Sequence, residues 1–340
     1  MNLPSIYIRS VGTELPGAAI DNRAVAARLG LDENWIDHFI GTKTRHFALD
    51  LQTGEQTSTL AEIGARAAMK AIERAGISHR DIDFIVLATA TPDELMPATV
   101  NRIADLLEID VVPTYQLQSG CAGAMQAIDV GVLLCRLEQH RNGLIIGGDV
   151  CAKQMRFDRD FSTVGPSELV NYLLFGDGAG AIVLSKEPGV ASMKIHCVLN
   201  QLVGLGREPG QVIRWFGERD RRTEVRAVNE DYKAIEARVP DMATEAVFQL
   251  LDRSGWSVDE VRYFLPPQLS GRMTEFIEAA LPVSNAQVIN CVAETGNNGN
   301  ALPFLQLDRL QTKIQSAEKA MCICVESSKW IKAGLTLEGV

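Results

Sequence analysis

The sequence contains an internal duplication, and this repeat restricts the fold more than any other feature of the chain. Residues 68–87 read AMKAIERAGISHRDIDFIVL, and residues 247–266 read VFQLLDRSGWSVDEVRYFLP. In both copies a helical pattern ends at a glycine, and a charged turn then leads into an apolar strand. Two more pairs follow in the same order: SGCAGA (119–124) with TGNNGN (295–300), and GLIIGGDV (143–150) with AMCICVES (320–327). We therefore predict two similar halves, 1–186 and 187–340, that pack about a pseudo-dyad.

Each half alternates helical and strand patterns. Residues 60–75 carry apolar side chains at helical spacing, whereas 83–90, 143–150 and 180–186 are continuous apolar runs. Strands this apolar are usually buried on both faces of a sheet that helices cover, so the predicted class is α/β. The stretch 200–240 is charged and contains glycines, and we interpret it as a surface excursion that contributes to a substrate mouth.

Composition and charge exclude several classes of protein. Lys plus Arg is 33 and Asp plus Glu is 43, a net charge of −10. This balance argues against nucleic acid or an anionic membrane as a partner, because binding to either needs excess positive charge. The start has no signal-peptide pattern, and no apolar run reaches the length of about 18 residues that a transmembrane helix needs. We expect a cytoplasmic protein without a metal site, since no His, Cys and carboxylate spacing fits one. The seven cysteines form no C-x-x-C pair, and we expect most of them to be buried, reduced thiols. They are residues 121, 135, 151, 197, 291, 322 and 324.

Cys121 is the strongest candidate for chemistry. It stands between Gly120 and Gly123, after a strand-like stretch and before an amphipathic run at 124–137. The first free amides of a helix and its dipole stabilise a thiolate, so this position predicts a lowered thiol pKa and a nucleophile. A packed cysteine in a tight turn is the alternative. The matching turn of the second half predicts that Asn297 faces Cys121, where its amide can donate to a thioester carbonyl, or is simply a turn asparagine.

Four motifs together resemble a known enzyme family. FGDGAGAIVL (175–184) lacks the spacing of a phosphate loop, and we interpret it as close backbone packing before a strand. With SGCAGA (119–124), TPDELMP (91–97) and GNNGNALP (296–303), it resembles the β-ketoacyl-acyl-carrier-protein synthase III family. This resemblance implies the thiolase-like fold, two α/β halves in a five-layered α-β-α-β-α arrangement. It further implies a homodimer and an acyl-cysteine intermediate, formed from an acyl thioester of coenzyme A or an acyl carrier protein. No bound cofactor is implied.

The chain departs from the family pattern where a catalytic histidine belongs. The family reads V-P-H-Q-A-N-x-R, and this chain reads LPPQLSGR at 265–272. Pro267 therefore stands at the histidine position, while Gln268 and Arg272 match the family. The resemblance makes Gln268 a possible auxiliary residue and Arg272 a contact for the acidic carrier protein. Proline offers no side-chain donor, and the loss of one such donor typically costs about 100- to 1000-fold in rate.

A second departure lies near the C-terminus. VESSKW (325–330) stands where the family has a glycine triplet before a tryptophan. One amide of that triplet helps to form the oxyanion hole in the family, so we expect a reshaped hole here. Glu326 is then a hypothetical general base, with a solvated rim residue as the alternative.

The third departure concerns the coenzyme A entrance. The segment WIDHFIGTKTRH (35–46) keeps Trp35 and Arg45 but has Phe39 and Ile40 in place of the Arg-Thr pair that contacts the nucleotide in the family. Fewer phosphate contacts favour an acyl donor on a carrier protein over coenzyme A. Met96 resembles a family residue that reaches into the acyl tunnel of the partner subunit.

Three functions follow from these observations. The first is an acyltransferase in which Cys121 takes an acyl group and passes it to a hydroxyl or amine of a small metabolite. The second is a decarboxylative Claisen condensation with a malonyl carrier, which would release carbon dioxide. The third is a non-catalytic partner subunit of a heterodimer. The loss of the histidine with retention of the cysteine favours the first.

Overall fold

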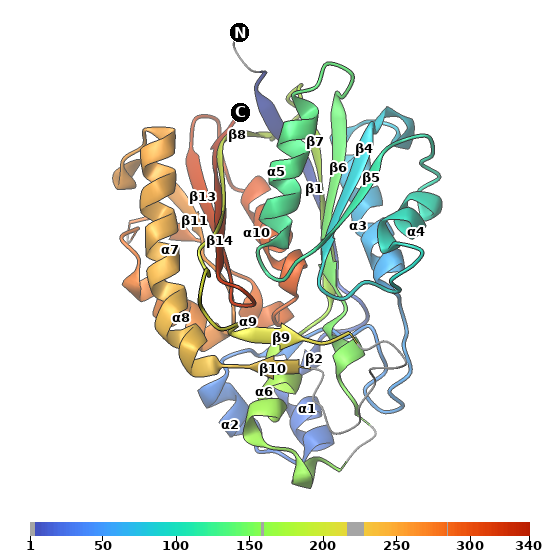
Figure 1. Ribbon diagram of the computed structural model, residues 1–340, viewed down its shortest axis with the longest axis vertical. Helices are drawn as coiled ribbons and strands as arrows, with labels where there is room; N and C mark the ends of the chain where they lie inside the picture. The colour runs from blue at the N-terminus through green and yellow to red at the C-terminus, as the bar shows by residue number, and fades with distance from the viewer. Residues whose placement is uncertain (1–3, 158–159, 216–227, 284) are drawn as a thin grey trace.

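The computed structural model describes residues 4–157, 160–215, 228–283 and 285–340. In these ranges one large mixed sheet has the strand order β12-β11-β13-β14-β8-β1-β7-β6-β4-β5 (Figure 1). The strands of its first set are β1 (Ile6–Glu14), β4 (Phe84–Thr89), β5 (Thr114–Gln118), β6 (Asn142–Asp149) and β7 (Gly178–Ser185). Those of its second set are β8 (Met193–Leu202), β11 (Val261–Leu265), β12 (Gln287–Val288), β13 (Lys319–Glu326) and β14 (Ile331–Gly339). The order within the first set is repeated in the second, and β1 pairs with β8 where they meet.

Helices complete five layers (Figure 1). The outer layers are α3 (Leu60–Ala75) with α4 (Thr99–Leu106) on the first set, and α7 (Tyr232–Ser254) with α8 (Gly271–Ala280) on the second. The middle layer holds α5 (Gly123–Cys135) and α10 (Leu302–Gln311). The predicted α/β class and the five-layered thiolase-like arrangement are therefore confirmed. The division at 186/187 remains our proposal for where one half ends.

Shorter elements gather at one end of the sheet, at the bottom of Figure 1. The helices among them are α1 (Asn22–Leu29), α2 (Glu33–Phe39), α6 (Pro166–Leu174) and α9 (Val292–Thr295). The strands are β2 (Ile20–Asp21), β3 (Thr44–Arg45), β9 (Gln211–Ile213) and β10 (Val228–Glu230). This end contains the carboxyl ends of β4, β5 and β6, where ligands bind in open α/β sheets.

The two copies of the duplicated helix begin and end with similar local chemistry. Thr59 and Glu62 form a capping box at the start of α3, and Gly76 ends it with φ 65°. Asp231 accepts a hydrogen bond from the third residue of α7, and Gly255 ends that helix with φ 68°. A side-chain oxygen satisfies an otherwise unpaired amide at each start, and glycine adopts the left-handed conformation at little cost at each end.

Phe304 of α10 holds the middle layer against the first set of strands. Its side chain is fully buried. A Cβ added to Gly180 on β7 would lie 2.2 Å from the Phe304 Cβ, and one added to Gly147 on β6 would lie 2.4 Å from its Cε2. Neither position can accept a larger residue without displacing the ring. The interpretation of 175–184 as close backbone packing is therefore confirmed.

The stretch 200–240 is only partly the surface excursion that its composition predicted. β9 and β10 pair with each other outside the large sheet, and Gln211, Ile213 and Val228 line a cavity described below. Residues 216–227 of the predicted excursion lie outside the described residues. The prediction was wrong for its last part, because α7 begins at Tyr232 and packs on β8, β13 and β14.

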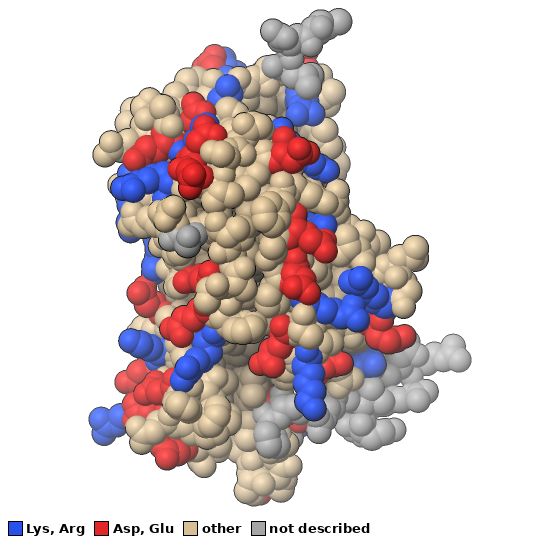
Figure 2. All heavy atoms as spheres, turned by 90° about the vertical axis from the view of Figure 1, so that its left-hand side faces the viewer, with Lys and Arg blue, Asp and Glu red and all other residues tan. Residues whose placement is uncertain are grey.

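Two observations concern the membrane-spanning and nucleic-acid-binding classes that the sequence argued against. In the described part of the chain, no helix is both long and apolar enough to span a bilayer. On the face that α7 covers, lysine and arginine side chains are interspersed with acidic ones and form no single basic patch (Figure 2).

The packing of Phe304 gives a test of the middle layer. We expect Phe304→Ala to lower the free energy of unfolding by about 3–5 kcal/mol, since it leaves a cavity between α10 and two glycines that cannot fill it. Phe248→Ala on α7 is the matched control, because that side chain is 53% exposed. Urea unfolding followed by circular dichroism measures both. Equal losses for the two variants would contradict the assigned role of Phe304.

Candidate active site

Cys121 lies in the turn between β5 and α5, as the sequence predicted. Side chains of the second set of elements hold this turn. Asn300 donates from Nδ2 to the Ser119 carbonyl at 3.0 Å. Glu326, the last residue of β13, accepts from Ser119 Oγ at 2.9 Å and from the Ala122 amide at 3.3 Å. The Cys121 turn is therefore positioned by residues that lie far from it in the sequence.

Glu326 is buried against the Cys121 turn and is not a solvated rim residue. Its side chain is 4% exposed, and the Ser328 hydroxyl contacts its second oxygen. Gly120 makes room for it, because a Cβ at Gly120 would lie 3.1 Å from the Glu326 Cδ. The alternative of a rim residue was wrong, since β13 extends to this position and places the carboxylate inside.

The predicted lowering of the Cys121 pKa was wrong. Burial raises the pKa of the thiol well above its usual value, and the negative charges of Glu326 and Asp149 raise it further. The reason is geometric. α5 begins at Gly123, and the Ala122 amide donates to Glu326 and is therefore not free to stabilise a thiolate. A thiol with a raised pKa is a weak nucleophile unless a base removes its proton.

Asp149 is a second buried carboxylate at the site, and the sequence analysis did not identify it. It ends β6, as Glu326 ends β13. Its Oδ2 accepts from the Asn300 amide at 2.8 Å and from the Asn300 side chain at 2.9 Å, while its Oδ1 accepts from Thr89 and Thr91. Burial raises its pKa. The last residue of a strand in each set thus places a carboxylate against the turn of the other set: Asp149 at the Asn300 turn and Glu326 at the Cys121 turn. The duplication of GLIIGGDV and AMCICVES was the signal that could have found it.

A cavity of about 550 Å³ opens beside Cys121. Its walls include Ala90, Gly120, Cys151 and Gly299, together with residues of α6, β9 and β10. A second, small cleft of about 20 Å³ joins Cys121 to Pro267 and Gln268. None of the five histidines of the chain lines either space. Any proton transfer here among the described residues must use another group.

Asn297 lies in the turn before α10 that matches the Cys121 turn. It is 2% exposed, and its Oδ1 accepts from the Gly299 amide at 3.1 Å. This bond orients the side chain, so Nδ2 is the end that can donate elsewhere. Among the described residues of this turn, Gly299 lines both spaces next to Cys121. A direct role of Asn297 therefore stays a prediction.

Gln268 lies in the small cleft with Cys121 and has a structural task. Its Oε1 accepts from the amides of Cys291 and Val292 at 2.8 and 2.7 Å, and so caps the start of α9. Its Nε2 is buried and has no hydrogen-bond partner among the described residues. The auxiliary role predicted for Gln268 stays open, but its carbonyl oxygen is already used.

Trp35 and Arg272 lie together but away from the cavity. Trp35 on α2 packs against Phe39 with ring centroids 5.3 Å apart. Arg272 at the start of α8 donates from Nε to the His38 carbonyl of α2 at 2.7 Å. Their predicted roles in carrier or donor binding therefore concern the outer surface. Arg45, which is kept in the same motif, is fully buried and donates to Asn22 Oδ1 at 2.6 Å.

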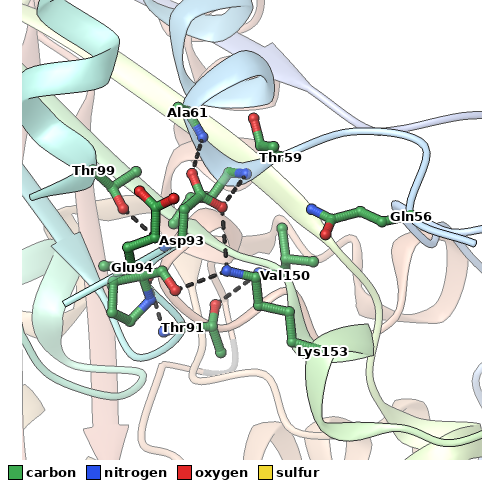
Figure 3. Close-up of polar contacts among 12 residues, drawn as sticks. Gln56, Thr59, Ala61, Thr91, Asp93, Glu94, Thr99, Val150 and Lys153 are labelled. Carbon is green, nitrogen blue, oxygen red and sulfur yellow. Dashed lines mark hydrogen bonds and ion pairs between the residues drawn. The ribbon is translucent and has the colours of Figure 1, made fainter. Parts of the chain in front are cut away.

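Met96 projects from a well-anchored loop. The Asp93 carboxylate accepts from the amides of Leu60 and Ala61 at the start of α3. Lys153 donates to Asp93 and to the carbonyl of Pro92, which ties the loop to the segment that follows Cys151 (Figure 3). Met96 itself is 88% exposed. A fixed loop with an exposed apolar tip suits contact with another subunit.

Comparison with known proteins identifies the family. Family models for 3-oxoacyl-[acyl-carrier-protein] synthase III match residues 115–199 and, for its C-terminal part, 251–327. The solved structure of AbyA1, a tetronic acid condensing enzyme, is 47% identical, with a TM-score of 0.95 over 98% of this chain and 100% of that one. The chain belongs to the 3-oxoacyl-(acyl-carrier-protein) synthase III family.

Curated synthases of this family are more distant. The β-ketoacyl-[acyl-carrier-protein] synthase III of Bradyrhizobium diazoefficiens is 29% identical over 86% of this chain and 87% of its own length. The synthase III structure from Pseudomonas aeruginosa shares the fold at 23% identity, with a TM-score of 0.82 over 98% of both chains. This chain is thus a condensing enzyme of the acyltransferase class.

Within the described residues, no group of three or more His, Cys, Asp or Glu side chains is arranged for a metal ion.

The charges around Cys121 predict how its reactivity depends on pH. Removal of the Glu326 charge takes away one of the groups that raise the thiol pKa. In Glu326→Gln we therefore expect the pH midpoint of Cys121 alkylation by iodoacetamide to move to lower pH. Peptide mass spectrometry measures it for this cysteine alone. Glu187→Gln, at an exposed ion pair with Arg141, is the matched control and should leave the midpoint in place. A midpoint that stays or rises in Glu326→Gln would show that the carboxylate does not act on the thiol.

Proposed function

We propose that this enzyme takes an acyl group onto Cys121 from a carrier-protein or coenzyme A thioester and transfers it to a hydroxyl oxygen of a second, small substrate. The observation that carries the proposal is a buried carboxylate, Glu326, that is hydrogen-bonded to the turn holding Cys121, next to a cavity that no histidine lines. In the family pattern a histidine assists malonyl decarboxylation, and Pro267 occupies the position of that histidine in this chain. A carboxylate, in contrast, is a suitable base for a thiol or a hydroxyl group.

The similarity to AbyA1 supports a hydroxyl acceptor. A tetronic acid is a five-membered lactone, so its ring contains an ester bond to a hydroxyl oxygen in addition to its carbon–carbon bonds. An enzyme that builds such a ring must deliver an acyl carbon to oxygen at some stage. We propose that this chain acts on substrates of the same kind.

The proposed reaction has two halves. Glu326 takes the proton of the Cys121 thiol as the sulfur attacks the donor carbonyl, and the C–S bond to the carrier breaks, with the proton passing to the carrier sulfur. The acceptor oxygen then attacks the acyl-cysteine, the C–S bond to Cys121 breaks, and the hydroxyl proton returns to the Cys121 sulfur. Asn297 Nδ2 is the proposed donor to the oxygen of the tetrahedral intermediates.

Two alternative functions would give different experimental results. A decarboxylative Claisen condensation with a malonyl carrier makes a carbon–carbon bond and releases carbon dioxide. A non-catalytic partner subunit would not acylate itself when purified alone.

The acyl donor is proposed to be a carrier protein. Acyl carriers are acidic, so the positive charge of Arg272 at the outer surface suits them.

Intact-protein mass spectrometry tests the first half of the reaction. We expect acyl-carrier and acyl-coenzyme A donors to add the acyl mass to the wild-type chain and to leave Cys121→Ala unmodified. Glu326→Gln should acylate about 100-fold more slowly, because a general base contributes about 100- to 10,000-fold. This slowing would occur although the same variant has the more acidic thiol, which separates a base from a purely electrostatic role. Acylation of the Ala variant, or no adduct with any donor, would contradict the proposal.

We also propose that the enzyme is a homodimer with a partner contact beside β5. Within the described residues this strand ends the sheet order, and β4 is its one neighbour there. Exposed apolar residues lie near it, including Met96 and Val111, which is 96% exposed. We expect light scattering to give twice the mass of one chain. Val111→Glu should shift the protein toward monomer, whereas Val190→Glu, at an equally exposed valine elsewhere, should not. A monomeric wild-type protein would refute this assembly.

A further inference from the structure

Part of the cavity wall is an ordered polar cluster that the proposed reaction does not use. Asn171 of α6 and Gln211 of β9 line the cavity. Gln211 donates from Nε2 to Glu230 Oε1 at 2.6 Å, and the Tyr232 hydroxyl donates to Asn171 Oδ1 at 2.7 Å. The Tyr232 hydroxyl also contacts the Glu230 carboxyl group. The two amides that line the cavity are thus connected through an acid and a phenol.

The cluster brings together segments that are distant in the sequence. Gln211 and Glu230 are paired residues of the β9–β10 ribbon. Tyr232 is the first residue of α7, and Asn171 lies near the end of α6. The ribbon lies outside the large sheet, so its position depends on contacts such as these.

The cluster acts on the same cavity as the nucleophile. Burial raises the pKa of Glu230, and burial together with Glu230 raises the pKa of Tyr232. Asn171 and Gln211 line the same cavity as Cys121 and Cys151. Burial is the main reason for the raised pKa of Cys151, and Glu230 makes the smallest of the contributions to it.

These contacts determine which acyl chains the wall suits. A plain alkyl chain against Asn171 and Gln211 would remove water from two amides without replacing its hydrogen bonds, and a site of this kind discriminates strongly against substrates that lack the matching polar group. Thr163 and Glu168, which line the same cavity, add to its polar character. An acyl chain that carries oxygen atoms can restore the lost bonds.

We propose that Asn171 and Gln211, held in place by Tyr232 and Glu230, recognise oxygen atoms on the acyl chain. The enzyme then selects acyl thioesters with an oxo group a few carbons from the thioester over plain alkanoyl thioesters. This inference rests on the proposed function, because it specifies the donor whose acyl group Cys121 receives. Asn171 and Gln211 are the specificity residues, and Tyr232 and Glu230 are positioning residues.

The test compares pantetheine thioesters of octanoate, 3-oxooctanoate and 5-oxooctanoate as donors. The rate of Cys121 acylation is followed by intact mass for the wild-type chain, Tyr232→Phe and Gln211→Met. We expect the wild type to prefer at least one oxo donor over octanoyl by about tenfold or more, and both variants to reduce the preference to within about threefold. Tyr263→Phe is the matched control, because its hydroxyl donates to the Lys313 carbonyl outside the cavity wall.

The ratio of rates separates recognition from stability. A variant that is merely less stable loses activity toward all three donors equally and keeps the wild-type ratio, and that result in both variants would overturn the inference. A wild-type enzyme that takes octanoyl as fast as both oxo donors would also overturn it, while leaving the proposed acyl transfer intact. Acylation by none of the three donors would overturn the proposed function and this inference together.

Discussion

The middle layer is the constraint on which the rest of the molecule depends. α5 and α10 are packed between the two sets of strands and share one core with both. Because Phe304 lies directly on Gly147 and Gly180, the helices cannot move away from the sheet without opening a cavity. The turns that precede α5 and α10 must then meet at the seam between the sets. Cys121 lies in one of these turns and Asn297 in the other.

Buried turns need partners for their polar groups, and the two strand ends supply them. Asp149 reaches from β6 to the Asn300 turn, and Glu326 reaches from β13 to the Cys121 turn. The same exchange that stabilises the seam places negative charge beside the thiol and raises its pKa. The raised pKa argues against a preformed thiolate, and the carboxylate that causes part of this rise is the base that we propose. This arrangement suits a reaction in which the proton leaves the sulfur only as the donor carbonyl is attacked.

The sequence predicted those features that depend on local pattern or on repetition. The duplication predicted the two sets of strands and the matching turns, and the glycines beside Cys121 predicted its turn between a strand and a helix. The direction of the Cys121 pKa could not be predicted, since it depends on Glu326, which lies more than half the chain away. The burial of Arg45 could not be predicted for the same reason, since its hydrogen-bond partners lie on α1 and α6. The polar cluster of Asn171, Gln211 and Glu230 joins three segments with no common pattern, so only the tertiary structure reveals it.

The central claim is that acyl-Cys121 delivers its acyl group to oxygen and not to a malonyl carbanion. The most direct measurement starts from isolated acyl-enzyme and offers it, in separate reactions, a malonyl carrier protein labelled at the free carboxyl group and a hydroxyacyl carrier protein. The account predicts loss of the acyl mass from Cys121 and formation of an ester with the hydroxyl acceptor, with no labelled carbon dioxide above the Cys121→Ala background. Rapid release of labelled carbon dioxide with transfer to the malonyl carrier, and none to the hydroxyl group, would contradict it.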